Sequence, residues 1–201
     1  MEIKDSGNTR KFDTGSHRDM SSGKGRMDLI PPEPIIAAME CKTNTEQTNL
    51  SSTKEDYLIE AMNMLLKFKQ TPKSINDTIP IAIRALLIAT GMEEGEIGDK
   101  DGNKPINKST ISYLAFGLKQ VSCHYEAGAI KYGADNWRLG QPISVLYDSG
   151  MRHLMKAMSG ITDEPHYRAS TWNVINLYWM YNYKPEMIDL PIMPSNKSDN
   201  P

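Results

Sequence analysis

The chain has 201 residues, of which 39% are hydrophobic and 24% charged, and its formal net charge is −2. This length suits one domain, or one domain with an inserted segment, and is enough to bury a hydrophobic core without disulfide bonds. The nearly neutral charge excludes an overall electrostatic footprint for nucleic acid or for an anionic membrane, so only a local patch could serve either purpose.

Cysteine usage and hydropathy indicate the cellular compartment in which the protein is expected. The two cysteines, Cys41 and Cys123, fit a reducing environment without a disulfide framework. The polar stretch from Met1 to Arg26 lacks the apolar centre of a signal peptide, and no run of eighteen apolar residues predicts a membrane span. We therefore expect a cytoplasmic protein that has no membrane partner.

The first forty residues combine a polar stretch with one short helix. Residues 1–26 are rich in Gly, Ser and charged residues, so they cannot bury enough apolar area to fold alone. Residues 1–11 are expected to form a flexible tail. A dense pattern of glycine-flanked charges follows over residues 12–32 and ends in an apolar run and two prolines. We predict that this segment is ordered against the C-terminal helices. A short helix is expected over residues 35–39.

Apolar spacing predicts the helices that follow. Residues 54–69 repeat apolar side chains at helical spacing, and residues 79–90 read as a short buried helix that ends at Gly91. Residues 93–108 read as a loop, whose Asp99–Asn103 stretch resembles part of a calcium loop but lacks the closing glutamate. A plain turn is the favoured interpretation there.

Three long helices complete the expected fold. The first begins at Ser109 and ends at Gly133, and the second runs from Pro142 to Gly160. The third is capped by Thr162 or Asp163 and runs to about Tyr183. No strand pattern is found. We therefore predict an all-α fold, a compact helical domain of four to six helices with an extended N-terminal motif segment.

Polar residues that could carry chemistry gather on these C-terminal helices. On residue type alone, Glu126 reads more readily as a solvated residue than as a metal ligand, and Arg152 can pair with Asp148 one turn away. Two acids before the last helix also favour the helix dipole. The candidate residues form three groups: Glu126, Lys131, Asn136 and Trp137; Asp148, Arg152 and His153; Asp163, Glu164, His166 and Asn173.

Several common site motifs are missing from the sequence. It has no GxxxxGK[ST] phosphate loop, no GxGxxG fingerprint, no CxxC pair and no His-Asp dipeptide. The remaining residues suit hard divalent-metal chemistry, in which carboxylates hold Mg²⁺ or Mn²⁺ and cationic side chains hold phosphates.

Four blocks in one order resemble the phage dATP/dGTP diphosphohydrolase N-terminal family. They are Phe12-Asp13-Thr14-Gly15 through Arg18-Asp19; Gly23-Lys24-Gly25-Arg26-Met27-Asp28-Leu29-Ile30-Pro31-Pro32; His124 through Gly133 with Asn136-Trp137 and Gly140; and Arg152-His153-Leu154 with Gly160, Asp163-Glu164-Pro165-His166 and Trp172-Asn173. The resemblance spans roughly residues 9–36 and 114–180. It implies a split core domain over residues 12–40 and 112–184, a mostly helical insertion over residues 41–111 and a flexible tail over residues 185–201.

The resemblance implies hydrolysis of purine deoxynucleoside triphosphates to monophosphate and pyrophosphate, in the cytoplasm of an infected host. The expected cofactor is Mg²⁺ or Mn²⁺, held by Glu126, Asp163 and Glu164, with Glu126 and His166 as catalytic residues. The expected substrate-binding residues are Lys24, Arg26, Lys131, Asn136, Trp137, Arg152, His153 and Asn173. The alternative is a non-catalytic nucleotide-binding or partner-binding phage protein that keeps the pocket. The insertion reads as a cap, a lid or an oligomer surface, which leaves a homo-oligomer open.

Overall fold

The computed structural model describes residues 9–11, 13–14, 17–19, 23–48, 52–97 and 108–190. Seven α-helices lie in these ranges, and one of them, α2, has four residues. The prediction of an all-α fold with an N-terminal motif segment is confirmed. The α-helices are α1 (Pro32–Glu40), α2 (Asn44–Gln47), α3 (Lys54–Gln70), α4 (Ile75–Ile97), α5 (Thr110–Tyr132), α6 (Ile143–Met158) and α7 (His166–Tyr183).

Short elements join or precede these helices. Two unpredicted three-residue strands, β1 (Thr9–Lys11) and β2 (His17–Asp19), pair antiparallel with Arg10 opposite Arg18. Four 3-10 turns are η1 (Met27–Leu29), η2 (Pro72–Ser74), η3 (Asn136–Leu139) and η4 (Pro185–Met187).

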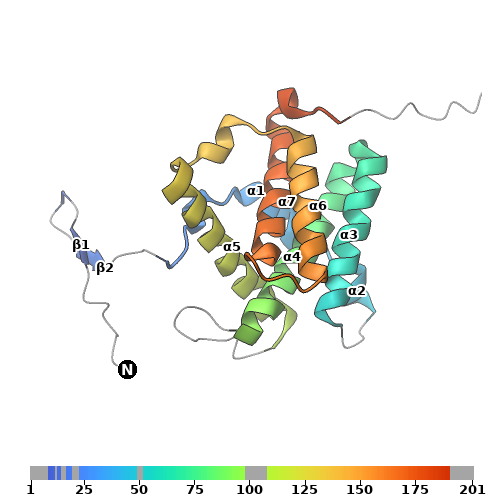
Figure 1. The fold of residues 1–201 in the computed structure, drawn as a ribbon, viewed down its shortest axis with the longest axis horizontal. Helices are drawn as coiled ribbons and strands as arrows, with labels where there is room; N and C mark the ends of the chain where they lie inside the picture. Colours follow the sequence, from blue (N-terminus) through green and yellow to red (C-terminus); the bar gives the residue numbers. More distant parts are fainter. Residues whose placement is uncertain are drawn as a thin grey trace, which may run out of the picture.

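Helix α4 lies at the centre of the bundle. It packs against α1, α3, α5 and α7, while α6 covers the other side of α7 and reaches α3 (Figure 1). Its side chains Ile83, Leu87 and Ile88 are fully buried among these neighbours. The stretch Pro72–Glu93 is long and apolar enough to span a membrane by composition, but 78% of it is buried inside this bundle. Packing within the fold accounts for that apolarity.

This central place changes the interpretation of residues 41–111. The segment is mostly helical, as expected, but it supplies the helix on which both α5 and α7 pack. If residues 41–111 were a removable insertion, the core would stay closed without them. Because α4 fills that core, we revise the interpretation: the segment is part of the domain itself.

Helices α4 and α5 approach each other closely at two glycines. A Cβ on Gly91 would lie 1.9 Å from the carbonyl oxygen of Tyr113, and one on Gly117 would lie 2.0 Å from that of Leu87. Gly91 was expected to end its helix, but α4 continues to Ile97. The missing side chain serves the helix contact instead.

Most helix ends follow the expected signals. Ser109 caps α5 through a reciprocal pair with Ser112, and Gly133 ends the helix with φ of +93°. The expected cap of the last helix at Thr162 or Asp163 is wrong, because α7 begins at His166 after Pro165. The Asp99–Asn103 stretch lies outside the described residues, as do residues 191–201 of the expected C-terminal tail.

Candidate functional site

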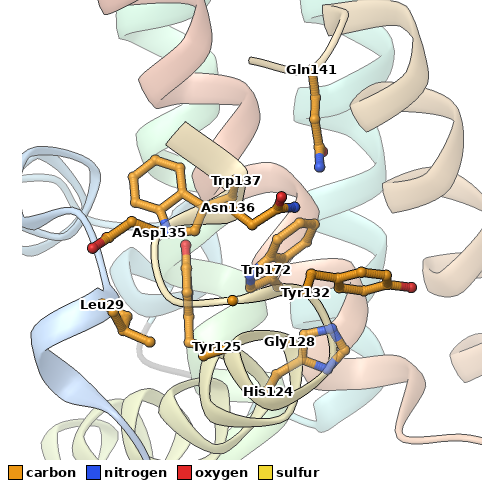
Figure 2. Close-up of a pocket in the computed structure, with 12 residues that line it drawn as sticks. Leu29, His124, Tyr125, Gly128, Tyr132, Asp135, Asn136, Trp137, Gln141 and Trp172 are labelled. Carbon is orange, nitrogen blue, oxygen red and sulfur yellow. The ribbon is translucent and has the colours of Figure 1, made fainter. Parts of the chain in front are cut away.

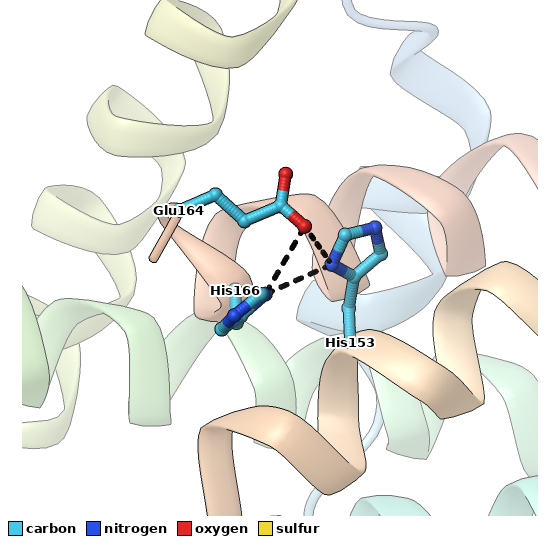
Figure 3. A group of neighbouring side chains, drawn as sticks. All are labelled: His153, Glu164 and His166. Carbon is cyan, nitrogen blue, oxygen red and sulfur yellow. Dashed lines mark hydrogen bonds and ion pairs between the residues drawn. The ribbon is translucent and has the colours of Figure 1, made fainter. Parts of the chain in front are cut away.

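Two histidines and one carboxylate converge where α6 meets the start of α7 (Figure 3). The Nδ1 atoms of His153 and His166 lie 3.0 Å apart. Glu164 Oε1 lies 3.4 Å from His153 Nδ1 and 3.5 Å from His166 Nδ1. These three residues are the ones within the described ranges whose donor atoms could together hold a metal ion.

The α6–α7 connection brings these side chains together. His153 lies on α6, and the chain turns back at Gly160, which has φ of +68°. Glu164 then precedes α7, and His166 is the first residue of that helix. The side chain of His166 is only 1% exposed, whereas that of Glu164 is 48% exposed, so the group is open to solvent on the glutamate side.

Asp163 and Lys156 surround this group. Asp163 Oδ1 lies 2.5 Å from His166 Nε2, and Lys156 Nζ lies 3.1 Å from Asp163 Oδ2. Hydrogen bonds from Lys156 and then His166 lower the pKa of the Asp163 carboxyl. The ionised carboxylate therefore accepts the Nε2 proton of His166, which leaves Nδ1 with a free lone pair facing His153 and Glu164. Burial lowers the pKa of His153, an effect that the Glu164 charge opposes.

A cavity of about 350 Å³ lies between α5, η3 and α7 (Figure 2). Its wall is largely aromatic, with polar groups at the rim. It is lined by Leu29, His124, Tyr125, Gly128, Ala129, Tyr132, Gly133, Asp135, Asn136, Trp137, Gln141 and Trp172. An apolar concave wall with few polar groups is the usual form of a small-molecule site.

Trp137 forms part of the cavity wall. Its ring is 5% exposed and meets Tyr125 and Trp179 edge to face, at 6.1 and 5.0 Å between centroids. The Arg138 guanidinium lies 4.9 Å from the ring centroid. The ring is thus enclosed by neighbours, and among the described residues its buried Nε1 has no hydrogen-bond partner.

His124 connects the cavity to the histidine–glutamate group. Its ring faces Trp172 at 5.8 Å between centroids, and it also lines the cavity. Burial lowers the pKa of His124 to about 4, with smaller effects from the charges of Arg168, His153 and Glu164. The imidazole is therefore neutral at neutral pH. Arg168 reaches Gln120 with one guanidinium nitrogen, at 3.4 Å, while its Nε is buried without a partner.

Glu126 holds the N-terminal motif segment. Its carboxylate accepts hydrogen bonds from the backbone N–H groups of Gly23, at 2.8 Å, and Gly25, at 3.0 Å. The backbone N–H of Arg26 donates to the carbonyl of Ser122 on the same helix. A Cβ on Gly25 would lie 2.0 Å from Ser122 Oγ, and its φ is +86°, so glycine is required there. We name these contacts the glycine clasp.

The clasp bears on two expectations. Residues 23–32 are ordered against α5, as predicted, whereas residues 12, 15–16 and 20–22 lie outside the described part of the chain. Glu126 acts as an anchor and is not among the three converging donors, so its expected roles in catalysis and cation binding stay predictions.

The other predicted substrate residues lie at different distances from the cavity. Asn136 and Trp137 line it. Arg26 pairs with Asp28 at 2.6 Å, Lys131 Nζ lies over the ring of Tyr132, and Lys24 is an exposed residue beside the clasp. Arg152 is exposed and donates to Ser149. Asn173 is buried, and its amide donates to Ala169 O on its own helix, where α7 packs close to Gly150.

Several site residues were not predicted. His124, Tyr132, Asp135, Gln141 and Trp172 line the cavity. His124, Tyr132 and Trp172 lie inside the motif blocks, but residue type alone did not separate them from core residues. Asp135 carries one further signal: it takes φ of +59° before η3, a conformation that non-glycine residues seldom adopt.

The comparison with protein families agrees with this geometry. The model of the family described as dATP/dGTP diphosphohydrolase, N-terminal, matches residues 95–189. Residues 95–189 are similar to this family. The matched segment contains the cavity wall from α5 to α7 and all three converging donors, and it confirms the resemblance drawn from the motifs that lie within it. No curated protein and no solved structure matches the chain.

Proposed function

We propose that this protein is a metal-dependent hydrolase that converts dATP or dGTP to the monophosphate and pyrophosphate in phage nucleotide metabolism. The observation that carries the proposal is that the family-matched segment holds both an aromatic cavity and three side chains whose donor atoms could together hold a metal ion. The family description supplies the reaction class, and the cavity supplies room for a purine.

The chemistry requires little covalent participation by the protein. Hydrolysis adds one water across the anhydride between the α- and β-phosphates, and the proton released passes to solvent. A divalent cation, Mg²⁺ or Mn²⁺, would neutralise charge on the phosphate oxygens. The side chains of His153, Glu164 and His166 would hold it, because their donor atoms converge and one side is exposed.

The remaining residues would position the nucleotide. A purine in the cavity would contact Trp172. Lys156 carries positive charge beside the histidine–glutamate group, with Nζ 4.0 Å from Glu164 Oε1, where the phosphates would lie. Neutral His124 lines the cavity and could accept a hydrogen bond or a proton from the nucleotide.

The test is a screen of the metal-stripped full chain against the four dNTPs with Mg²⁺ or Mn²⁺, with pyrophosphate and monophosphate quantified by chromatography. We expect dATP and dGTP to be hydrolysed faster than dCTP and dTTP. Glu164→Gln should reduce turnover at least about 100-fold, as expected for loss of a metal-ligating charge. Glu186→Gln is the control, because this exposed acid follows α7 and pairs with Lys184 on the surface, so its turnover should be unchanged.

A second variant tests the cavity separately. Gly128 lines it, and a Cβ there meets nothing within 4 Å, so Gly128→Leu should fill the cavity. Nucleotide binding should be lost while metal binding remains. If no dNTP releases pyrophosphate with either metal, the protein is not this hydrolase. A nucleotide that still raises the melting temperature would then support the non-catalytic binding protein, because stabilisation by a ligand does not require turnover.

A further inference from the structure

The distances within the histidine–glutamate group match those of a transition-metal site. Ligand nitrogen and oxygen atoms lie about 2.0–2.2 Å from such an ion, so two ligands at the tetrahedral angle are about 3.4 Å apart. The three separations here are 3.0 Å between the two Nδ1 atoms and 3.4 and 3.5 Å from these to Glu164 Oε1. The first of these is a hydrogen bond between the two rings, so an ion contacting all three donors would replace that hydrogen bond and move the rings slightly apart.

The three donors direct acceptor atoms and one negative charge toward a common point, which Lys156 Nζ approaches to 4.0 Å from Glu164 Oε1. The Asp163 carboxylate can only accept a hydrogen bond, so Nε2 of His166 donates to it, and in the neutral imidazole Nδ1 presents a lone pair. Glu164 Oε1 presents negative charge to the same point. One proton on His153 Nδ1 can form a hydrogen bond to His166 Nδ1 or to Glu164 Oε1. A divalent cation could instead be bound by all three atoms at once.

The donor set discriminates between metals. Mg²⁺ binds oxygen ligands and keeps several waters, whereas imidazole nitrogen is preferred by first-row transition metals. Two of the three donors here are imidazole nitrogens. Two histidines with one glutamate also occur as the protein ligands of catalytic zinc.

We propose that His153, Glu164 and His166 bind a first-row transition-metal ion in preference to Mg²⁺, with Asp163 as the positioning residue for His166. This proposal specifies the metal of the proposed function, and it rests on that function for the role of the cation. Of the two cations named there, the donor set favours Mn²⁺ over Mg²⁺. The exposed side of Glu164 leaves coordination positions for water or phosphate oxygen, so the site is of the open kind.

The experiment measures metal binding directly, without nucleotide. The metal-stripped full chain is titrated with Mg²⁺, Mn²⁺, Co²⁺ or Zn²⁺ by calorimetry, and Co²⁺ binding is followed by its visible absorption. We expect one equivalent of Co²⁺ or Zn²⁺ to bind at least about 100-fold more tightly than Mg²⁺, with Mn²⁺ between them. The Co²⁺ spectrum should show an ion of low coordination number with nitrogen ligands.

Variants separate this site from adventitious binding. His153→Gln and Glu164→Gln should each abolish the Co²⁺ spectrum, and the exposed Glu164 provides a variant that should fold even if His153→Gln does not. Asp163→Ala should weaken binding about 10- to 100-fold while leaving the type of spectrum unchanged, as expected of a residue that acts through a ligand. Glu186→Gln is the matched control for Glu164→Gln, and it should bind metal like the natural chain.

Two results would overturn the proposal: Mg²⁺ binding as tightly as Co²⁺, or Co²⁺ binding unchanged in Glu164→Gln. These results are distinct from failure of the proposed function. If the metal binds as expected but no dNTP is hydrolysed, the site stands and the hydrolase assignment falls. If dNTPs are hydrolysed with Mg²⁺ but the titration shows no preference, the hydrolase stands and the metal selectivity falls.

Discussion

Glu126 is a buried acid whose charge is matched by backbone amides. Replacing it with glutamine keeps one oxygen acceptor for the clasp but places an NH₂ group against the other N–H, from Gly23 or Gly25. We expect Glu126→Gln to lower the free energy of unfolding by about 1–3 kcal/mol, because a part-buried amide loses a charged acceptor. Chemical denaturation measures this change.

The exposed Glu186 provides the control for this substitution. Glu186→Gln should change stability by less than about 0.5 kcal/mol, since the residue makes a surface pair with Lys184 at 3.7 Å. Equal stability of the Glu126→Gln variant would show that the clasp contributes nothing to folding. Turnover of the same variant tests whether Glu126 also acts in catalysis.

A part-buried acid, Glu46, makes stability depend on pH. Burial opposes ionisation of Glu46, but hydrogen bonds from Arg84, at 2.6 and 2.7 Å, and from Thr43 outweigh this effect. The pKa of Glu46 is therefore lowered from its ordinary value of 4.5. A lowered folded-state pKa adds stability that is fully present above the unfolded value and is lost as pH falls through the folded value.

This contribution should disappear on acidification below about pH 4.5, the unfolded value. Urea denaturation between neutral pH and pH 3 should show part of the acid loss of stability in the natural chain and less of it in Glu46→Gln. At neutral pH the variant should be about 3 kcal/mol less stable, because it leaves the part-buried Arg84 without its charged partner. Parallel pH curves for the two proteins would contradict this account.

At the scale of elements, the α4–α5 contact depends on missing side chains. Gly117→Ala places a Cβ 2.0 Å from a backbone carbonyl oxygen of α4, so one helix must shift. We expect it to destabilise the fold by about 1–3 kcal/mol through overpacking. Gly128, on the same helix, meets nothing within 4 Å, so Gly128→Ala should stabilise by about 0.5–1 kcal/mol through helix propensity. Thermal unfolding of both variants, compared with the natural chain, checks the opposite signs.

Sequence patterns predicted the helices well where local signals decide the structure. Ser109 and Gly133 mark the limits of α5 because a cap and a left-handed residue act within a few positions. The same patterns failed where packing against another helix decides the structure. Gly91 reads as a helix end, yet it lies inside α4 because α5 needs the space of its side chain.

The candidate site was predicted in part for the same reason. Glu164 was expected as a metal ligand and His166 as a catalytic residue because the motif that contains them resembles the family's last motif. His153 was assigned to the substrate, since nothing local shows that α6 brings it to 3.0 Å from His166. The contacts of Glu126 with Gly23 and Gly25 join residues about a hundred positions apart, which spacing cannot reveal.

At the scale of the whole molecule, the family-matched segment does not include most of α4, the helix on which it packs. Residues 95–189 include α5, α6 and α7 but only the last turn of α4. Without α4, the buried faces of α5 and α7 would meet water. We expect a fragment of residues 95–190 to lack cooperative unfolding, and removal of residues 41–111 to have the same effect. Circular dichroism and thermal melting of both shortened proteins test this. A cooperative transition in either would restore the interpretation of a separable insertion.

The glycine clasp places two trypsin-sensitive bonds where they report on folding. Cleavage after Lys24 or Arg26 requires the chain to enter the protease in extended form, yet this backbone is tied to α5 through Gly23, Gly25 and Arg26. The rate of cutting at these bonds therefore measures how often the segment detaches while the rest of the protein stays folded. Limited proteolysis with trypsin, followed by mass spectrometry, can therefore measure the local opening of this segment without any label.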